Sequence, residues 1–336
     1  MSRYSMVLYL GVLCFLSCKD DPSGYRNVNA GGALGTSYSI ISITSEQVEL
    51  QEQIDSVFAV INQSLSTYLP ESDISKINRG DSTLMVDHMF REVFALSKEI
   101  YEDTEGYFDP TVGTLVNAWG FGPELQMELD SAKVDSLLRY VGFGKVALTA
   151  DHTIKKADPK VYMDFNAIAK GYAIDRLAAM LDERNVEHYL IEVGGELVAK
   201  GINASKGKPW VVGIDDPQMD TERTTKLLIN LKDKALASSG NYRKFRVDER
   251  TGKKYVHTIN PKTGFTQNSN TLAVTILAND CATADGYATA FMAMELSEAF
   301  KLINKNVDLD AYIVYLDENG ETQEFLTKGF KALVVE

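Results

Sequence analysis

Basic residues are scarce in this chain of 336 residues, and they do not cluster: 34 Lys and Arg stand against 47 Asp and Glu, for a formal net charge of −13. This balance argues against a nucleic-acid partner, because neutralising phosphates requires a basic surface. Disorder is also disfavoured, since 45% of the residues are hydrophobic. The chain can therefore bury a large core, as one domain or as two closely packed lobes. No segment repeats at a fixed period.

Cysteine is rare as well, with three residues, and a hydrophobic run long enough for a membrane span is missing. The apolar run Met6–Leu16 follows Arg3 and precedes Ser17-Cys18. Such a run is short for a span and predicts a signal peptide over residues 1–17. The ending resembles the lipobox of bacterial lipoproteins, in which the cysteine becomes the lipidated first residue of the mature chain. Ordinary cleavage and an uncleaved anchor are the alternatives.

Lipidation at Cys18 would have consequences for the rest of the chain. Cys14, which follows a bulky leucine and is the weaker lipidation candidate, would leave with the signal peptide. Only Cys18 and Cys281 would remain, so no internal disulfide could form. Polar, turn-rich residues 18–30 predict a flexible tether, and residues 31–336 the folded domain. We expect a protein anchored by lipid in a bacterial cell envelope, facing the periplasm or the exterior.

Helical and strand patterns alternate irregularly along the folded part. The spacing of apolar residues predicts helices at 45–64, 86–104, 130–140, from Cys281 onward and at 297–304, and strands or hairpins at 36–43, 145–156, 188–201, 210–217, 226–233, 235–245, 255–264, 271–277, 311–315 and 324–327. Regular βαβ alternation is missing. The class predicted is therefore α+β, with mixed, largely antiparallel sheets, flanking helices and two intimate lobes.

The stretch Val161–Asp175 is the centre of the functional prediction, because its pattern indicates a strand, a tight turn and a helix. A strand-to-helix turn presents backbone N–H groups to a ligand, and helix N-termini favour phosphates. Lys170 adds a positive charge near the helix start. Asp164, just before the turn, can accept a hydrogen bond from a ligand's ring or coordinate a cation.

Two glycine-rich segments have no regular pattern. Residues 31–35 are either a loop for close approach of a cofactor or a plain turn, and Gly106–Gly122 indicates a structured loop of the kind that builds ligand sites. Phe108 and Trp119 in that loop can equally be core residues, and for Trp119 the core is favoured. Tyr68, where the chain leaves a predicted helix, is expected to be half-buried or to stack on a flat ring.

A late alanine-rich helix carries a second set of polar residues. Asp285 and Thr289 are four residues apart, so their oxygens lie on one face of a helix. A carboxylate beside a hydroxyl suits Mg²⁺, which takes its other ligands from water and phosphates. The alternative is that Asp285 caps the helix and Thr289 bonds its own backbone. His257 is either a general base or a hydrogen-bonded structural residue.

Taken in order, these segments resemble one family. The series comprises Leu34-Gly-Thr36, Leu65-Ser-Thr-Tyr68, Gly106-Tyr-Phe-Asp109, Asp164 to Tyr172, Val193-Gly-Gly195, Ser239-Gly-Asn-Tyr242, His257 to Pro261 with Thr263-Gly264, and Ala284-Asp285 to Thr289. It is similar to the ApbE family of FAD:protein FMN transferases, from about Gly31 to about Met294. The lipobox agrees with this resemblance, since many members are periplasmic lipoproteins.

The resemblance implies roles for individual residues and a flavin site between the two lobes. The flavin and its diphosphate would be held by Leu34, Tyr68, Tyr107, Phe108, Asp109, Asp164, Lys170 and Ile259, several of them through backbone atoms. Mg²⁺ would be bound by the Ala167 carbonyl and the side chains of Asp285 and Thr289. Two departures stand out: Leu34 replaces a usual methionine, and Phe165-Asn166 replaces the commoner leucine with a small residue. The second bears on the turn that presents Ala167.

The resemblance also implies a reaction. FAD would be the substrate, a Thr or Ser hydroxyl of a target protein the acceptor, and AMP the leaving group, with Asp285 and His257 as the catalytic residues. The alternatives are a Mg²⁺-dependent FAD pyrophosphatase, in which water replaces the acceptor, and a flavin-binding lipoprotein without chemistry. An intact Asp285 and Thr289 pair argues against the last, because a carrier does not need to position a cation.

Overall fold

A computed structural model describes residues 24–124, 126–218, 224–241, 245–247, 254–267 and 269–335. The predicted signal peptide, Cys14 and Cys18 lie outside these residues, as does Tyr242. Within the described ranges, no helix is both long enough and apolar enough to cross a membrane.

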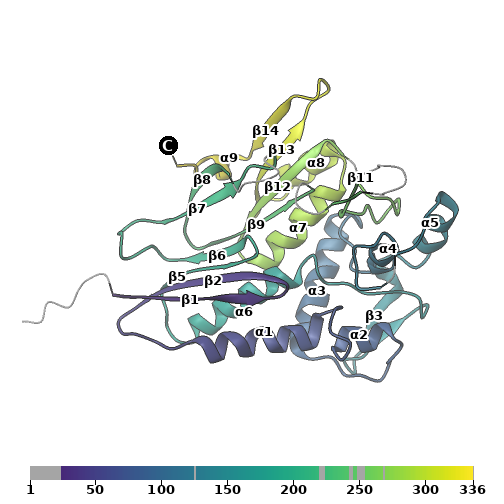
Figure 1. Cartoon of the computed structure of the whole chain (residues 1–336), viewed down its shortest axis with the longest axis horizontal. Helices are drawn as coiled ribbons and strands as arrows, with labels where there is room; N and C mark the ends of the chain where they lie inside the picture. The colour runs from purple at the N-terminus through teal and green to yellow at the C-terminus, as the bar shows by residue number, and fades with distance from the viewer. Residues whose placement is uncertain are drawn as a thin grey trace, which may run out of the picture.

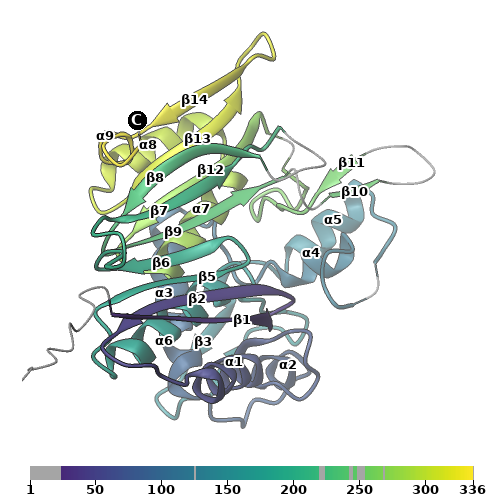
Figure 2. The same cartoon turned by 60° about the vertical axis from the view of Figure 1, so that its left-hand side comes forward.

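The centre of the fold is one eight-stranded sheet, seen in Figure 2, with the strand order β1-β2-β5-β6-β9-β12-β13-β14. All of its strand pairs are antiparallel. The strands are β1 Tyr25–Ala33, β2 Thr36–Thr44, β5 His188–Val193, β6 Glu196–Lys200, β9 Lys234–Gly240, β12 Thr271–Ala278, β13 Asp310–Leu316 and β14 Thr322–Leu326. The predicted α+β class with largely antiparallel sheets and flanking helices is confirmed.

Helices cover one face of this sheet (Figure 1) and enclose the largest hydrophobic core. They are α1 Gln51–Leu65, α3 His88–Asp103, α6 Ala169–Asp182, α7 Cys281–Ala293 and α8 Leu296–Lys305. α7 packs on β9 and β12 on one side and on α6 and α3 on the other. All of its residues except Thr283 and Thr289 are consequently buried, which explains why its sequence is rich in alanine.

The opposite face of the sheet is covered by a hairpin of β7 Trp210–Asp215 and β8 Thr225–Leu231, together with the short helix α9 Lys328–Lys331. Trp210, Ile229 and Phe330 are the large side chains buried there. The sheet is thus the middle layer of three, and the polar residues discussed below lie on its helical side.

A smaller lobe projects from the main body (Figure 2). It contains α4 Gly113–Ala118, α5 Ser131–Leu138, β10 Phe245–Val247 and β11 Lys254–Val256. Its own small core includes Leu115, Trp119, Val134 and Ile259. The prediction that Trp119 is a core residue is confirmed. The remaining elements are α2 Asp73–Asn78, which Ser72 caps, the short helix η1 Phe143–Lys145, and the hairpin β3 Val146–Leu148 and β4 Ile154–Lys156.

The N-terminal hairpin corrects two predictions. β1 begins at Tyr25, so the flexible tether predicted for residues 18–30 is wrong from Tyr25 onward. Gly31 belongs to the strand and not to a loop; it faces Tyr38, and a Cβ on it would lie 2.9 Å from that ring. The turn itself is Leu34-Gly35, with φ values of 52° and 74°, the positive φ pair that a tight antiparallel hairpin requires.

The strand predicted at the centre of the chain is wrong, although the helix after it, α6, is confirmed. Only Tyr162 forms a bridge, to Val112. The extended segment is held instead by the Asn78 side chain, which accepts from the Met163 N–H at 2.8 Å and donates to the Met163 carbonyl at 2.8 Å. One amide thus replaces a neighbouring strand and leaves the turn that follows unconstrained by a sheet.

Three boundaries also differ from prediction. The first helix begins at Gln51 and not near residue 45. The loop predicted at 106–122 contains α4. The strand predicted at 255–264 ends at Val256, because the next residues form a loop organised by Asn260, whose side chain accepts from the N–H groups of Lys262 and Thr263.

Candidate active site

α6 and α7 cross at Gly171, which brings Asp285 to the start of α6. A Cβ at Gly171 would lie 2.3 Å from the Cys281 carbonyl oxygen, so only glycine permits this approach. The Gly171 N–H donates to Asp285 Oδ2 at 3.1 Å. Asp285 is 4% exposed, and burial raises its pKa even though Lys170 opposes the shift. A carboxylate is therefore held between two helices with less solvation than it would have in water.

Lys170 and Glu196 lie beside this carboxylate. Lys170 Nζ forms an ion pair with Glu196 Oε1, and the two side chains are 28% and 6% exposed. Although burial disfavours the charged amine, the Asp285 and Glu196 carboxylates raise the pKa of Lys170. Glu196 Oε2 is buried without a hydrogen-bond partner. Sequence reasoning missed Glu196, and the available signal was its position directly after the Gly194-Gly195 turn.

Two hairpin turns meet the start of α6 at this place. A Cβ at Gly194 would lie 2.8 Å from Thr36 Cγ2 and 3.4 Å from Lys170 Cδ. The β1–β2 turn, which carries the half-buried Leu34, is thus adjacent to the β5–β6 turn and to Lys170. Segments far apart in the sequence are brought together, as their shared resemblance implied.

The alternative role of Asp285 as a helix cap is wrong. Asp280 caps α7 by accepting from the Thr283 N–H at 2.8 Å. Asp175 of α6 supports the same end, accepting from the N–H groups of Cys281 and Ala282 at 2.8 Å each. Asp285 is therefore free of a capping role. Thr289, one turn further along α7, is partly exposed, and Ala167 lies in the turn before α6.

Asp164 is a second buried carboxylate, close in sequence to the turn before α6. Its N–H donates to the Pro110 carbonyl at 2.7 Å, and its Oδ1 accepts from the Asn166 N–H at 2.7 Å. Burial raises its pKa. Tyr68 is 59% exposed, more than predicted, yet burial of its hydroxyl and the nearby Asp164 carboxylate raise its pKa. A largely exposed tyrosine thus lies near a buried carboxylate.

The last three residues of Gly106-Tyr-Phe-Asp109 have different environments. Tyr107 donates from its hydroxyl to Glu298 at 2.6 Å, and the Lys262 ammonium lies 3.9 Å from the centre of its ring. Phe108 is 3% exposed and belongs to the main core. Asp109 is buried and accepts from the N–H and the hydroxyl of Thr111 at 2.8 and 2.6 Å. A ligand would therefore meet the last two mainly through the backbone.

The buried Asp109 makes a testable contribution to stability. Burial raises its pKa from 3.8 to about 6, with the Thr111 hydrogen bonds opposing the shift. The pKa of Asp109 is higher in the folded protein than in the unfolded chain. Its contribution to the free energy of unfolding is therefore complete below pH 4, where the carboxyl is protonated, and is lost as the pH rises through 6. We expect Asp109→Asn to remove about 3 kcal/mol from the pH dependence of the free energy of unfolding. Urea unfolding of both proteins between pH 3.5 and 7 measures it, and parallel curves would contradict it.

The loop after β11 carries His257 and Ile259. His257 is partly buried, and Ile259 packs into the small core beside Trp119. Asn260 fixes this loop to the end of α7, because its amide donates to the Ala293 carbonyl at 3.3 Å. The Trp119 indole N–H holds the loop's other end through the Gly264 carbonyl at 2.9 Å. The loop with His257 is thus attached to the helix that carries Asp285 and Thr289.

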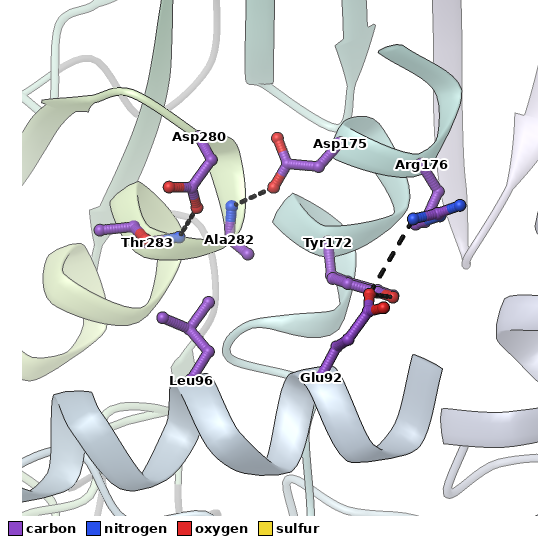
Figure 3. A pocket seen from close by; sticks show the side chains of 8 residues that line it. All are labelled: Glu92, Leu96, Tyr172, Asp175, Arg176, Asp280, Ala282 and Thr283. Carbon is purple, nitrogen blue, oxygen red and sulfur yellow. Dashed lines mark hydrogen bonds and ion pairs between the residues drawn. The ribbon is translucent and has the colours of Figure 1, made fainter. Parts of the chain in front are cut away.

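A cavity of about 340 Å³ lies elsewhere, among α3, α6 and the start of α7 (Figure 3). Its lining is Glu92, Leu96, Tyr172, Asp175, Arg176, Asp280, Ala282 and Thr283. The polar side chains there are already engaged: Tyr172 donates to Glu92, Arg176 faces Glu92 at 3.9 Å, and Asp175 and Asp280 bond the first turn of α7. None of the predicted site residues lines this cavity, so it is not the predicted flavin site.

The sequence model that describes the ApbE family matches residues 34–313 of this chain. The chain belongs to the ApbE family. An FAD:protein FMN transferase of Haemophilus influenzae is 34% identical over 316 residues, covering 90% of this chain and 89% of that protein. An ApbE flavin transferase structure from Vibrio cholerae superposes with a TM-score of 0.82 at 30% identity, covering 92% and 99% of the two chains.

An ApbE protein from Thermotoga maritima gives a TM-score of 0.81 at 28% identity, over 93% of this chain and 100% of that one. The alignments with these relatives therefore cover nearly the whole length of this chain and of theirs. Within the ApbE fold of this chain, Asp285, Lys170, Thr36 and Gly194 are neighbours, and the loop with His257 is attached to the same helix as Asp285. The individual ligand contacts of these residues stay predictions.

Proposed function

We propose that this protein is an FAD:protein FMN transferase, which moves the FMN part of FAD onto a Thr or Ser hydroxyl of a target protein and releases AMP. The observation that carries the proposal is the match with transferases over about nine-tenths of both chains. The buried group of Lys170, Glu196 and Asp285 at the helix crossing supports it.

The flavin and diphosphate are assigned to the region between the two hairpin turns, the start of α6 and the loop of Tyr107. Lys170 supplies a positive charge for the diphosphate, and the exposed ring of Tyr68 supplies a surface for stacking. The backbone of Phe108 and Asp109, the side chain of Asp164, and Leu34 and Ile259 complete the proposed contacts.

The donor set fits a divalent cation. Lys170 forms an ion pair with Glu196 and neutralises only one of the two buried carboxylates, so ionised Asp285 leaves a negative charge for a cation. No cluster of three or more His, Cys, Asp and Glu suited to a metal occurs among the described residues. The proposed donors are all oxygen atoms, which are the ligands that Mg²⁺ prefers. Asp285, Thr289 and the Ala167 carbonyl would hold it. When bound, Mg²⁺ would stabilise negative charge on the diphosphate.

The proposed reaction exchanges one phosphoester partner for another. The acceptor hydroxyl oxygen forms a bond to the FMN-side phosphorus, the bond from that phosphorus to the bridging oxygen breaks, and AMP leaves with the bridging oxygen. His257 is assigned as the group that accepts the hydroxyl proton. Lys170 and Tyr68 orient the FAD, so that the hydroxyl approaches opposite the leaving group.

Release of AMP with and without an acceptor tests the function. Purified protein is incubated with FAD, Mg²⁺ and an acceptor protein that carries a Thr or Ser flavinylation motif, and the acceptor is weighed by mass spectrometry. We expect FMN mass on the acceptor and AMP release that depends on the acceptor. AMP release at equal rate without acceptor would favour the pyrophosphatase, and FAD binding without AMP at any Mg²⁺ concentration would favour a carrier.

We also propose that the protein is a lipoprotein of the bacterial cell envelope, anchored through Cys18. The apolar run before this cysteine and the polar residues after it support the proposal. The change Cys18→Ser should move the full-length protein out of the membrane fraction and abolish labelling by a fatty-acid analogue. Membrane association and labelling that persist in Cys18→Ser would refute it.

A further inference from the structure

Lys170 lies within reach of two buried carboxylates but pairs with only one. Its ammonium forms an ion pair with Glu196 Oε1. Asp285 is nevertheless a close neighbour, because Gly171, the residue directly after Lys170, donates its N–H to Asp285 at 3.1 Å. Within the described part of the chain, no ion pair joins Lys170 to Asp285, whose Oδ2 accepts from the Gly171 N–H instead. The amine is therefore held away from the carboxylate that is proposed to bind Mg²⁺.

Glu196 has the rigid support that such a role requires. It is the first residue after the Gly194-Gly195 turn and pairs with Val193 across the hairpin. Both glycines have positive φ, 64° and 105°, which fixes the direction in which β6 starts. Glu196 is 5% exposed, and its Oε2 is unpaired. Burying a carboxylate is costly unless it is paired, and Lys170 is the partner of Glu196.

We propose that Glu196 is a positioning residue that holds the Lys170 ammonium off Asp285, so that Asp285 stays available to a divalent cation. Without Glu196, the amine would turn to the remaining carboxylate and compete with the cation for it. This inference rests on the metal site in the proposed function. It adds that the β5–β6 hairpin, which supplies no ligand itself, determines how tightly the cation binds.

A double-mutant cycle separates this role from a direct effect of Glu196 on the cation. Binding of Mn²⁺ is measured by electron paramagnetic resonance on the purified protein without FAD or acceptor, with Mg²⁺ as competitor. We expect Glu196→Gln to weaken Mn²⁺ binding about tenfold in the wild-type background, by analogy with the effect of residues that orient metal ligands. In the Lys170→Met background, the same change should weaken it less than twofold, because no amine is left to compete.

An equal loss in both backgrounds would overturn the proposal, because Glu196 would then act on the cation itself. Unchanged binding in Glu196→Gln would overturn it too. Glu196→Asp serves where Gln impairs folding: it retains the charge but is too short to hold Lys170, so weaker Mn²⁺ binding in it is also expected. Glu192→Gln is the matched control. Glu192 belongs to the same hairpin and accepts from the Gly195 N–H at 2.6 Å, and its replacement should leave Mn²⁺ binding unchanged.

The outcome is independent of whether FMN is transferred. A protein that binds Mn²⁺ and shows the cycle but transfers no FMN would retain the role of Glu196 and lose the transferase. A protein that transfers FMN but shows equal losses in both backgrounds would retain the transferase and lose the positioning role. Absence of Mn²⁺ binding in the wild-type protein would remove both the metal site and the role of Glu196.

Discussion

Asp285→Asn should reduce FMN transfer about 10³-fold, which is typical of losing one electrostatic stabiliser of a developing charge. The change removes the anionic oxygen proposed to bind Mg²⁺ and leaves the shape of the side chain almost unaltered. The rate of AMP release in the presence of acceptor measures the effect. FAD binding by fluorescence quenching, without added metal, should change little.

The fold should tolerate this substitution. Burial raises the pKa of Asp285, so its charge is disfavoured in the folded protein, and a neutral amide removes that cost. The melting temperature of Asp285→Asn should equal or exceed that of the wild type. Asp280→Asn is the control, because asparagine caps a helix as well as aspartate does, and it should retain full transfer. Wild-type activity in Asp285→Asn would eliminate the metal site.

The sequence allowed the helices to be predicted best, and the reason is local. α3 and α6 have apolar residues at helical spacing. Asp87 caps α3 and Ser72 caps α2, each by accepting a hydrogen bond from an N–H group in the first turn. The Asp285 and Thr289 pair was found for the same reason, since residues four apart on a helix share a face. A pattern of this kind does not depend on what the rest of the chain does.

Features that depend on distant residues could not be predicted. The segment before Asp164 resembles a strand, yet the N–H and the carbonyl of Met163 bond the Asn78 side chain, 85 residues away in sequence. β1 looked like a tether because its sequence is polar and turn-rich, and pairing with β2 made it a strand. Glu196 stood in a predicted hairpin without a visible role until the fold placed Lys170 beside it.

The family resemblance supplied what local patterns could not, namely which distant motifs belong to one site. The structure then distinguishes between side chains that are available to a ligand and those that are already engaged. Phe108 and Asp109 are engaged within the protein, whereas Tyr68 has an exposed ring. Both kinds were predicted as ligand contacts, and only the three-dimensional environment separates backbone from side-chain roles.

His257→Ala should lower FMN transfer by about 10²-fold or more, the usual contribution of a general base. The loop of His257 is fixed to α7 through Asn260 and to the small lobe through Gly264 and Trp119. Asn260 and Trp119 are unchanged in the variant, so these two anchors should keep the loop in its place. We therefore expect FAD binding by fluorescence to be retained and the loss to fall on kcat.

The pH profile separates a proton acceptor from a structural residue. Imidazole titrates near neutral pH, so a general base makes kcat fall on the acid side of the profile, and His257→Ala should lack that limb. His88→Ala is the control, since His88 is exposed at the first position of α3, and it should behave as wild type. Full transfer in His257→Ala with FAD still bound would remove His257 from the reaction. A lower kcat with an unchanged acid limb would give it a positioning role only, and the hydroxyl proton would then leave by another route.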